Sequence, residues 1–380
     1  MLHLLPYSYV KVNDRLRYMI DDGLIRCTGK GADKHYALLD AGREMLHASN
    51  SSRYPRCLFA DNNTLLRAPV RAMATGDAAA LLHLGEYTVH PTTKPALPAQ
   101  TPIFEEEIER QLYQNMPHSS GSIRASPVNC YYTSVEIKRY FEGKNAAGLR
   151  YSRACGVLYT PDALLRVFHS RDVALEYKST GENKLTSLLP RLFPGYLPPC
   201  REALLVLGAG FTAARKILAE EFEPERVRMA RISGRTCLST RNLGRPLYYL
   251  PVQPASLPLL RLLGYPGWLD SVSSFLAGQL YEEYTLRQDA LYADGDDGTA
   301  LFIGVPFDLT AFAGLIRLLQ NRPQPVKLLC LDWQTAFYRE LMDMYTGDAS
   351  KQVQILSVTN DTVRDMDAQL SNYWGGDQDA

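Results

Sequence analysis

The sequence of 380 residues lacks several patterns that mark whole classes of protein. Its seven cysteines include no CxxC pair, and its seven histidines show no HxxxH or HExxH spacing. Neither a disulfide scaffold nor a zinc site is therefore indicated. Lysine and arginine together number 41, as do aspartate and glutamate, so no basic excess marks the whole chain as binding nucleic acid. Any nucleic-acid site must be local.

Long apolar runs are missing as well. The most apolar stretch, residues 301–316, is interrupted by Pro306 and Asp308 and is too short to span a bilayer. The first residues include no basic segment followed by a long apolar one, so no signal peptide is expected. The sequence predicts a soluble, cytoplasmic protein with no membrane partner.

The remaining composition is typical of a globular protein, with 46% hydrophobic and 22% charged residues. Apolar strands interleaved with helical segments predict an α/β (α+β) body. We expect three short antiparallel strands, followed by alternating helices and buried strands, and we see no internal repeat. The predicted strands of that meander are 154–159, 163–169 and 173–177. The predicted divisions are a module at 1–50, a helical connector with a Pro-rich linker at 51–102, the body at 103–345 and an acidic tail at 346–380.

The first fifty residues carry the clearest local signals. Apolar residues at helical spacing run from Tyr9 to Ile25, and Gly23 occupies the usual position after a helix. A short strand, a Gly-Lys-Gly turn and a return strand follow, and Asp40 is a good N-cap for a last helix. This order resembles a winged helix-turn-helix, a DNA-binding fold.

Basic side chains are suitably placed for such a function. We predict that the helix carries DNA-contacting residues and that the hairpin, as a wing, faces phosphates. The predicted DNA-binding residues are Lys11, Arg15 and Arg17 on the helix and Arg26, Lys30 and Lys34 on the wing. Residues 1–71 hold eleven basic against seven acidic residues, whereas residues 341–380 hold two against seven. The neutral total therefore conceals a charge gradient.

An alternative for this module is binding to protein, or a wing that packs only on its neighbours. A complete winged helix has two helices before the recognition helix, and only about eight residues precede this one. Three explanations remain open: the fold is completed from elsewhere, the given start of the sequence is late, or the module is a remnant.

A second candidate site resembles the PD-(D/E)xK nuclease signature. Thirteen residues separate Pro161-Asp162 from Glu176-Tyr177-Lys178. If the second and third strands of the meander pair, Asp162 and Glu176 could hold Mg²⁺ that activates water, with Lys178 stabilising the developing charge. A common Pro-Asp turn and an ordinary surface Glu/Lys pair explain the same residues.

A third candidate is the turn Gly208-Ala209-Gly210 after an apolar strand, which resembles a dinucleotide-binding turn. No acidic residue ends a clear next strand, so a plain strand-to-helix turn is the favoured interpretation.

Four longer strings resemble the replication-relaxation (MobC-like) proteins of conjugative elements and plasmids of Gram-positive bacteria. They are YYTSVEIKRYF, RYSRACGVLYTPDALLRVFHS, ALFIGVPFDLTAFAGLIRLL and LLCLDWQTAFYREL. The resemblance covers roughly residues 10–340 and implies an N-terminal winged helix before a degenerate restriction-endonuclease-like domain.

The resemblance implies a non-catalytic DNA-binding accessory protein of a mobile element, with double-stranded DNA and possible relaxase or other mobilisation proteins as partners. It implies no cofactor. The alternatives are a Mg²⁺-dependent nuclease, and a scaffold that binds proteins within a relaxosome.

Overall fold

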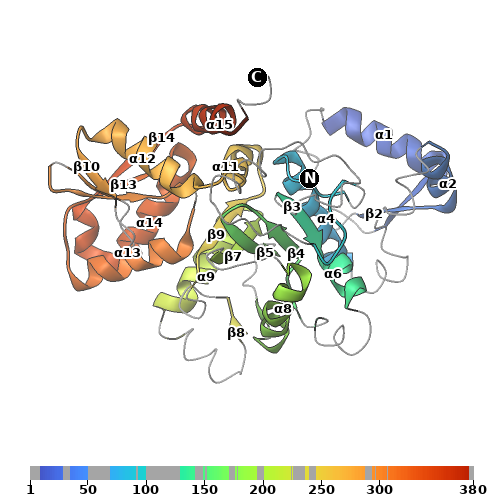
Figure 1. Ribbon diagram of the computed structural model, residues 1–380, viewed down its shortest axis with the longest axis horizontal. Coiled ribbons are helices and arrows are strands. Elements are labelled where there is room, and N and C mark those ends of the chain that lie inside the picture. Colours follow the sequence, from blue (N-terminus) through green and yellow to red (C-terminus); the bar gives the residue numbers. More distant parts are fainter. Residues whose placement is uncertain are drawn as a thin grey trace.

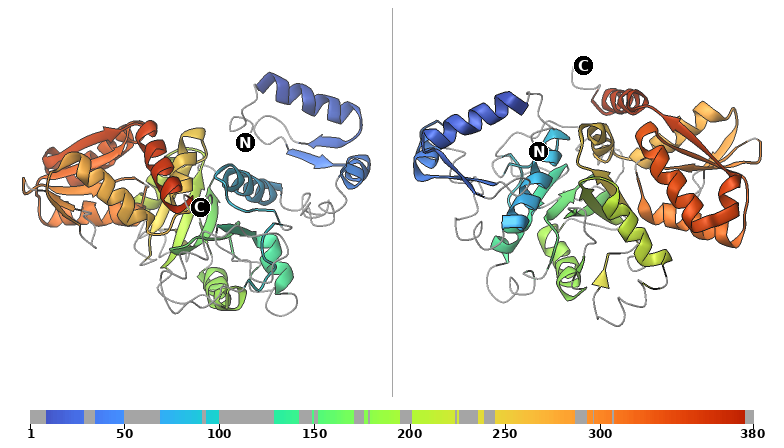
Figure 2. Two further views of the ribbon diagram at one scale, coloured as in Figure 1. Left: turned by 45° about the horizontal axis from the view of Figure 1, so that its top comes forward. Right: turned by 180° about the vertical axis from the view of Figure 1, so that it is seen from behind.

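The computed structural model describes sixteen stretches of the chain. They are residues 9–28, 35–49, 69–90, 93–99, 129–141, 149, 152–170, 176–177, 179–194, 201–223, 225, 236–238, 245–286, 293–295, 297–305 and 307–375. In Figure 1 these residues form three parts in a row: a small N-terminal module, a first sheet with its helices, and a second sheet with its helices. Both views in Figure 2 keep this order.

The N-terminal module contains helix, hairpin and helix, as the sequence predicted. Its elements are α1 (Tyr9–Asp21), β1 (Ile25–Thr28), β2 (His35–Leu38) and α2 (Asp40–Ser49). The two strands pair antiparallel over their whole length, from Ile25 opposite Leu38 to Thr28 opposite His35. The local signals of this segment therefore predicted its secondary structure correctly.

The first unit is built around a five-stranded mixed sheet with the order β3-β4-β5-β7-β9. The β3-β4 and β4-β5 pairs are antiparallel, whereas β5-β7 and β7-β9 are parallel. Its strands are β3 (Cys130–Thr133), β4 (Gly156–Tyr159), β5 (Ala163–Ser170), β7 (Arg201–Gly208) and β9 (Leu247–Pro251). Its helices are α4 (Pro69–Leu84), α6 (Ser134–Tyr140), α8 (Ser179–Leu192), α9 (Thr212–Phe222) and, after the short turn η5 (Pro254–Ser256), α11 (Leu257–Leu262).

The second unit has a five-stranded sheet with the order β10-β11-β12-β13-β14. The first two pairs are again antiparallel and the last two parallel. Its strands are β10 (Tyr284–Leu286), β11 (Ala293–Gly295), β12 (Ala300–Ile303), β13 (Val326–Leu331) and β14 (Val353–Val358). Its helices are α12 (Trp268–Leu280), α13 (Leu309–Asn321), α14 (Thr335–Thr346) and α15 (Asn360–Gly375), with the short turns η6 (Asp332–Gln334) and η7 (Gly347–Gln352).

The two units repeat one topology, which the sequence did not reveal. In each, a helix precedes three antiparallel strands, and two parallel strands follow, each reached through a helix. The first unit adds α6 and a separate two-stranded sheet of β6 (Glu176–Tyr177) and β8 (Thr236–Cys237). Our expectation of no internal repeat is therefore wrong for the fold, because strand order depends on the placing of apolar segments rather than on residue identity.

The two units share one hydrophobic core. The backbone N–H of Tyr249 in β9 donates to the carbonyl of Phe307 in the second unit, at 2.8 Å. Phe211 stacks on Phe337 with ring centroids 4.5 Å apart, and the buried residues of both units form a single cluster. The last helices of the two units also meet, since Tyr265 after α11 donates to Asp367 on α15 at 2.9 Å.

Two stretches expected outside the body belong to it. From the Pro-rich stretch, the side chain of Lys94 is buried, and Ala99 donates its N–H to Leu192 at 2.7 Å. From the acidic stretch 346–380, β14 pairs with β13 and α15 packs on α11. Both stretches are thus part of the packed units wherever the structure describes them.

Candidate nucleic-acid interface

The end of α1 is set by Gly23. Leu24 donates its N–H to Met19, and Gly23 donates to Ile20, at 2.9 and 3.0 Å. These bonds form a Schellman motif, and they require a left-handed residue, which Gly23 supplies with φ +67°. The chain therefore leaves α1 directly into β1.

A close contact fixes α2 against the hairpin. A Cβ on Gly42 would clash with the carbonyl oxygen of Leu24, so only glycine allows this approach. Leu39 also donates its N–H to Leu24 at 2.9 Å. Ile25 is buried where these elements meet. The module is thus a defined unit, although its described core is small.

Three of the six predicted DNA-binding residues are described, and all three are exposed. Arg15 and Arg17 lie on α1, and Arg26 lies on β1. The side chain of Lys11, on the first turn of α1, is not described, and Lys30 and Lys34 lie outside the described residues. In Figures 1 and 2 the module stands at one end of the molecule.

The exposed surface of α1 also carries carboxylates. Arg17 and Asp21 are 4.0 Å apart, with side chains 84% and 65% exposed, so their ion pair contributes little to stability. Asp14 is exposed on the same helix. The positive charge of α1 is therefore local rather than a continuous stripe.

Apolar side chains of the module are exposed as well. Tyr18 on α1 and Met45 on α2 are 68% and 60% exposed, and Ile20 and Tyr36 are partly exposed. Isolated exposed apolar residues are ordinary, but four in so small a module also suit contact with another surface.

The nuclease-like set is not arranged as predicted. Asp162 lies in the turn between β4 and β5, where its Oδ2 accepts the N–H of Gly267 at 2.8 Å, just before α12. Glu176 lies in β6, whose partner is β8, whereas β5 lies between β4 and β7. The expected pairing of the second strand with a third meander strand carrying Glu176 is therefore wrong. Lys178 lies outside the described residues.

The reason for this difference is tertiary. The strand β5 finds a parallel neighbour, β7, over eight residue pairs. A two-residue strand such as β6 cannot compete with that ladder for the edge of β5. It pairs with β8 in a small sheet of its own.

Sequence reasoning missed a buried ionic cluster in the first unit. Arg166 on β5 and Glu182 on α8 lie 3.7 Å apart, with both side chains less than a tenth exposed. Glu182 also accepts the N–H of Arg153 at 2.6 Å and the hydroxyl of Ser152 at 3.2 Å. The signal was an arginine inside the apolar run Ala163–Ser170, since a buried charge needs a counterion.

A second buried charge, Lys94, ties the Pro-rich stretch to the first sheet. Its ammonium lies 2.9 Å from Glu136, donates to the carbonyls of Val89 and Tyr131, and lies over the ring of Tyr132. Burial lowers the pKa of Lys94, and Glu136 opposes that shift. These contacts indicate that the role of Lys94 is structural.

The side chain of Tyr249 occupies the space beside the turn Gly208-Ala209-Gly210. A Cβ on Gly208 would clash with the hydroxyl of Tyr249, and that hydroxyl donates to the carbonyl of Gly210. The close backbone approach that glycine permits therefore serves Tyr249, in agreement with the plain-turn interpretation.

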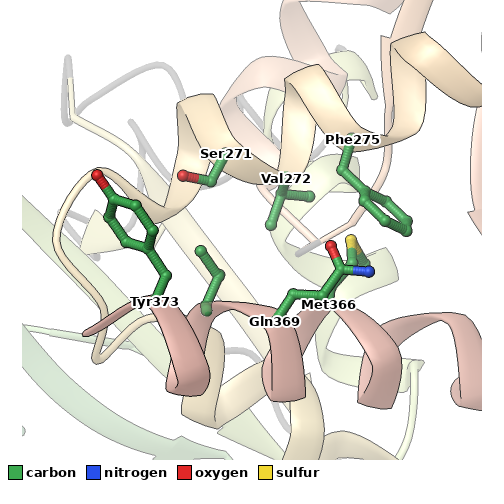
Figure 3. Close-up of a pocket in the computed structure, with 7 residues that line it drawn as sticks. Ser271, Val272, Phe275, Met366, Gln369 and Tyr373 are labelled. Atoms are coloured by element: carbon green, nitrogen blue, oxygen red, sulfur yellow. The ribbon is translucent and has the colours of Figure 1, made fainter. Parts of the chain in front are cut away.

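A groove lies between α12 and α15 (Figure 3). It encloses about 370 Å³ and is lined mainly by apolar side chains, with no charged group among them. The lining residues are Ser271, Val272, Phe275, Met366, Gln369, Leu370 and Tyr373. Such a lining can hold an apolar group, but it offers no acid–base pair.

Within the described stretches, no group of three or more His, Cys, Asp or Glu side chains is arranged to hold a metal ion. In the same stretches, no helix has the length and apolar character needed to cross a bilayer. Comparisons with protein-family models, curated proteins and solved structures found no match for this chain.

Proposed function

We propose that this chain is a non-catalytic DNA-binding accessory protein of a mobile genetic element, and that the N-terminal module is its DNA contact. The observation that carries the proposal is the exposure of Arg15, Arg17 and Arg26 on a helix and hairpin at one end of the molecule. The likeness of the sequence to replication-relaxation proteins supports the mobile-element context.

The geometry suits a duplex. An α-helix fits the major groove, and an adjoining hairpin can reach the neighbouring phosphates. Arg15 and Arg17 lie two residues apart on α1, so they point in different directions around the helix axis. One can thus approach base edges while the other approaches phosphate. Arg26 extends the contact onto the hairpin.

The test is a titration of duplex DNA at several salt concentrations with Arg15→Glu/Arg26→Glu. We expect affinity to fall at least about tenfold and the salt slope to decrease by about one for each replaced arginine that neutralises a phosphate in the wild type. Arg322→Glu, at an exposed arginine after α13, is the matched control and should bind like wild type. Equal binding by both variants would reject the module as the DNA contact.

A protein-binding scaffold is the second candidate, and the exposed Tyr18 and Met45 favour it. Tyr18→Ser/Met45→Ser separates the two functions. If the module binds DNA through its arginines, this variant should keep its DNA affinity within about threefold, because neutral side chains release no counterions. A loss as large as that of the arginine variant would favour an apolar partner surface.

The nuclease alternative has no support from strand pairing, because β6 does not neighbour β5. We expect no cleavage of linear, supercoiled or single-stranded DNA with Mg²⁺ or Mn²⁺. Cleavage that disappears in Asp162→Ala and in Lys178→Ala would establish the nuclease instead.

A further inference from the structure

The four edges of the two sheets are protected to very different degrees. At the β3 edge, Thr88 donates its N–H to Asn129 and accepts the N–H of Tyr131, at 2.8 and 2.9 Å. At the β9 edge, Tyr249 donates to Phe307, and Tyr248 forms a bridge with Asp308. Both edges of the first sheet are therefore covered by other segments of the chain.

The β10 edge of the second sheet is protected in another way. The strand has only three residues, Tyr284–Leu286. The exposed carboxylates Glu282 and Glu283 immediately precede it. Short length and adjacent charge are two devices by which proteins prevent pairing between sheet edges.

Among the described residues, the β14 edge shows none of these protections. Its six residues, Val353–Val358, contain no charge and no proline. In the sheet order β14 is terminal, with β13 as its one strand neighbour among the described residues. Residues 307–375 are all described, and they include β14 and the segments that precede and follow it in the sequence.

The apolar side chains of β14 are also less buried than those of its neighbour β13. Four of its six residues are apolar and only half-buried, whereas the apolar residues of neighbouring β13 are at most 2% exposed. The four are Val353, Ile355, Leu356 and Val358. Long, apolar and uncharged edges are rare on free surfaces because they pair with other strands.

We propose that β14 is a dimerisation edge that pairs antiparallel with β14 of a second copy of this chain, so that the two second sheets form one continuous sheet. The topologically equivalent edge, β9, is covered by backbone from a sheet unit of the same kind. A second copy offers such a unit to β14, which occupies the corresponding terminal position in the second sheet.

Symmetry makes β14 a good partner for itself. A twofold axis perpendicular to the sheet keeps each side chain on its own face, so that Ile355 or Leu356 lies opposite its own symmetry mate. The centre of the pairing is therefore apolar in either register. With no charge on the strand, no like charges meet across the axis.

The experiment is sedimentation velocity of the full chain over about a hundred-fold range of concentration. We expect a monomer–dimer equilibrium and, by hydrogen exchange, protection of β14 amides that increases with the dimer fraction. The disrupting variant is Gln354→Lys/Ser357→Lys, at the two exposed positions of β14. In either register, one of these lysines lies diagonally across the axis from its own symmetry mate on the same face, so association should weaken at least about tenfold.

Thr285→Lys, on the exposed β10 edge, is the matched control and should dimerise like wild type. Gln354→Asn/Ser357→Thr tests the same positions without charge and should also dimerise. A wild-type chain that stays monomeric throughout the range overturns the proposal. So does a dimer that the lysine variant leaves unchanged, because that dimer must use another surface.

Discussion

The two five-stranded units share a topology but differ in what fills them. The first unit buries Lys94, Arg166 and Glu182 beside its sheet. In the second unit, the buried carboxylates Asp308 and Asp367 both face the first unit, where Asp308 accepts the N–H of Leu247 and Asp367 accepts the hydroxyl of Tyr265. Its other large buried side chains are aromatic or aliphatic, with Phe302, Phe312 and Tyr338 fully buried.

This difference shows that strand order does not depend on the chemistry of the interior. Both units are specified by an apolar pattern that places strands between helices. The ion pairs of the first unit are added to that pattern and tie irregular segments to the sheet. We therefore expect the two units to respond differently to removal of a polar group.

The largest expected effect is in the first unit. Glu182→Ala leaves the guanidinium of Arg166 buried without its carboxylate. We expect a loss of about 3–5 kcal/mol in the free energy of unfolding, measured by urea denaturation. Arg166→Met/Glu182→Leu removes both charges and should recover most of the loss. A double variant as unstable as Glu182→Ala would show that the pair itself stabilises the unit.

The next effect concerns the junction between the units. Burial raises the pKa of Asp308 to about 6, although the N–H groups of Ala311, Leu247 and Thr310 oppose the shift. Since the unfolded value is near 4, the folded state holds the proton more tightly. This contribution to stability is full below about pH 4 and is lost as the pH rises to about 6.

Asp308→Asn removes that pH dependence while keeping an oxygen that can accept the same N–H bonds. We expect the variant to gain on the order of 2 to 3 kcal/mol relative to wild type between pH 4 and pH 7. Thermal melts across this range provide the measurement. A difference between variant and wild type that does not change with pH would contradict the raised pKa.

A smaller effect should be similar in both units. The hydroxyl of Tyr249 donates to Gly210 in the first unit, and that of Tyr338 donates to Gly304 in the second, at 3.0 Å. Tyr249→Phe and Tyr338→Phe each remove one such bond at a glycine. We expect each to cost about 1 kcal/mol in urea denaturation. A severalfold difference between the two losses of stability would mean that the two hydrogen bonds do not contribute equally to their units.

The smallest effect contrasts the module with the body. Gly23→Ala forces alanine into φ +67° and should destabilise the end of α1 by about 1 kcal/mol. Gly76→Ala in α4 meets no atom within 4 Å and should instead stabilise by about 0.5 to 1 kcal/mol. Hydrogen exchange of the α1 amides measures the effect of Gly23→Ala, and denaturation of the body measures the effect of Gly76→Ala. The same sign in both would contradict this account.

The site was only partly predictable. Arg15, Arg17 and Arg26 could be placed on exposed elements because helix and hairpin signals in this segment are local. The position of Glu176 could not, because it depends on which strand β6 meets. The partners of Arg166 and Asp162 were likewise unpredictable, since Glu182 and Gly267 lie 16 and 105 residues away along the chain.

The sequence by itself determined the helices and strands with strong local signals. Gly23 ends α1, and apolar runs predict β5 and β7. These choices depend on backbone conformation and side-chain period within a few residues. Only the tertiary structure decided the repeated strand order, the pairing of β6 with β8, the pairing of Arg166 with Glu182 and the terminal position of β14 in its sheet. Each of these depends on which distant segments occupy the same buried space and form the same backbone hydrogen bonds. A local sequence pattern does not contain this information.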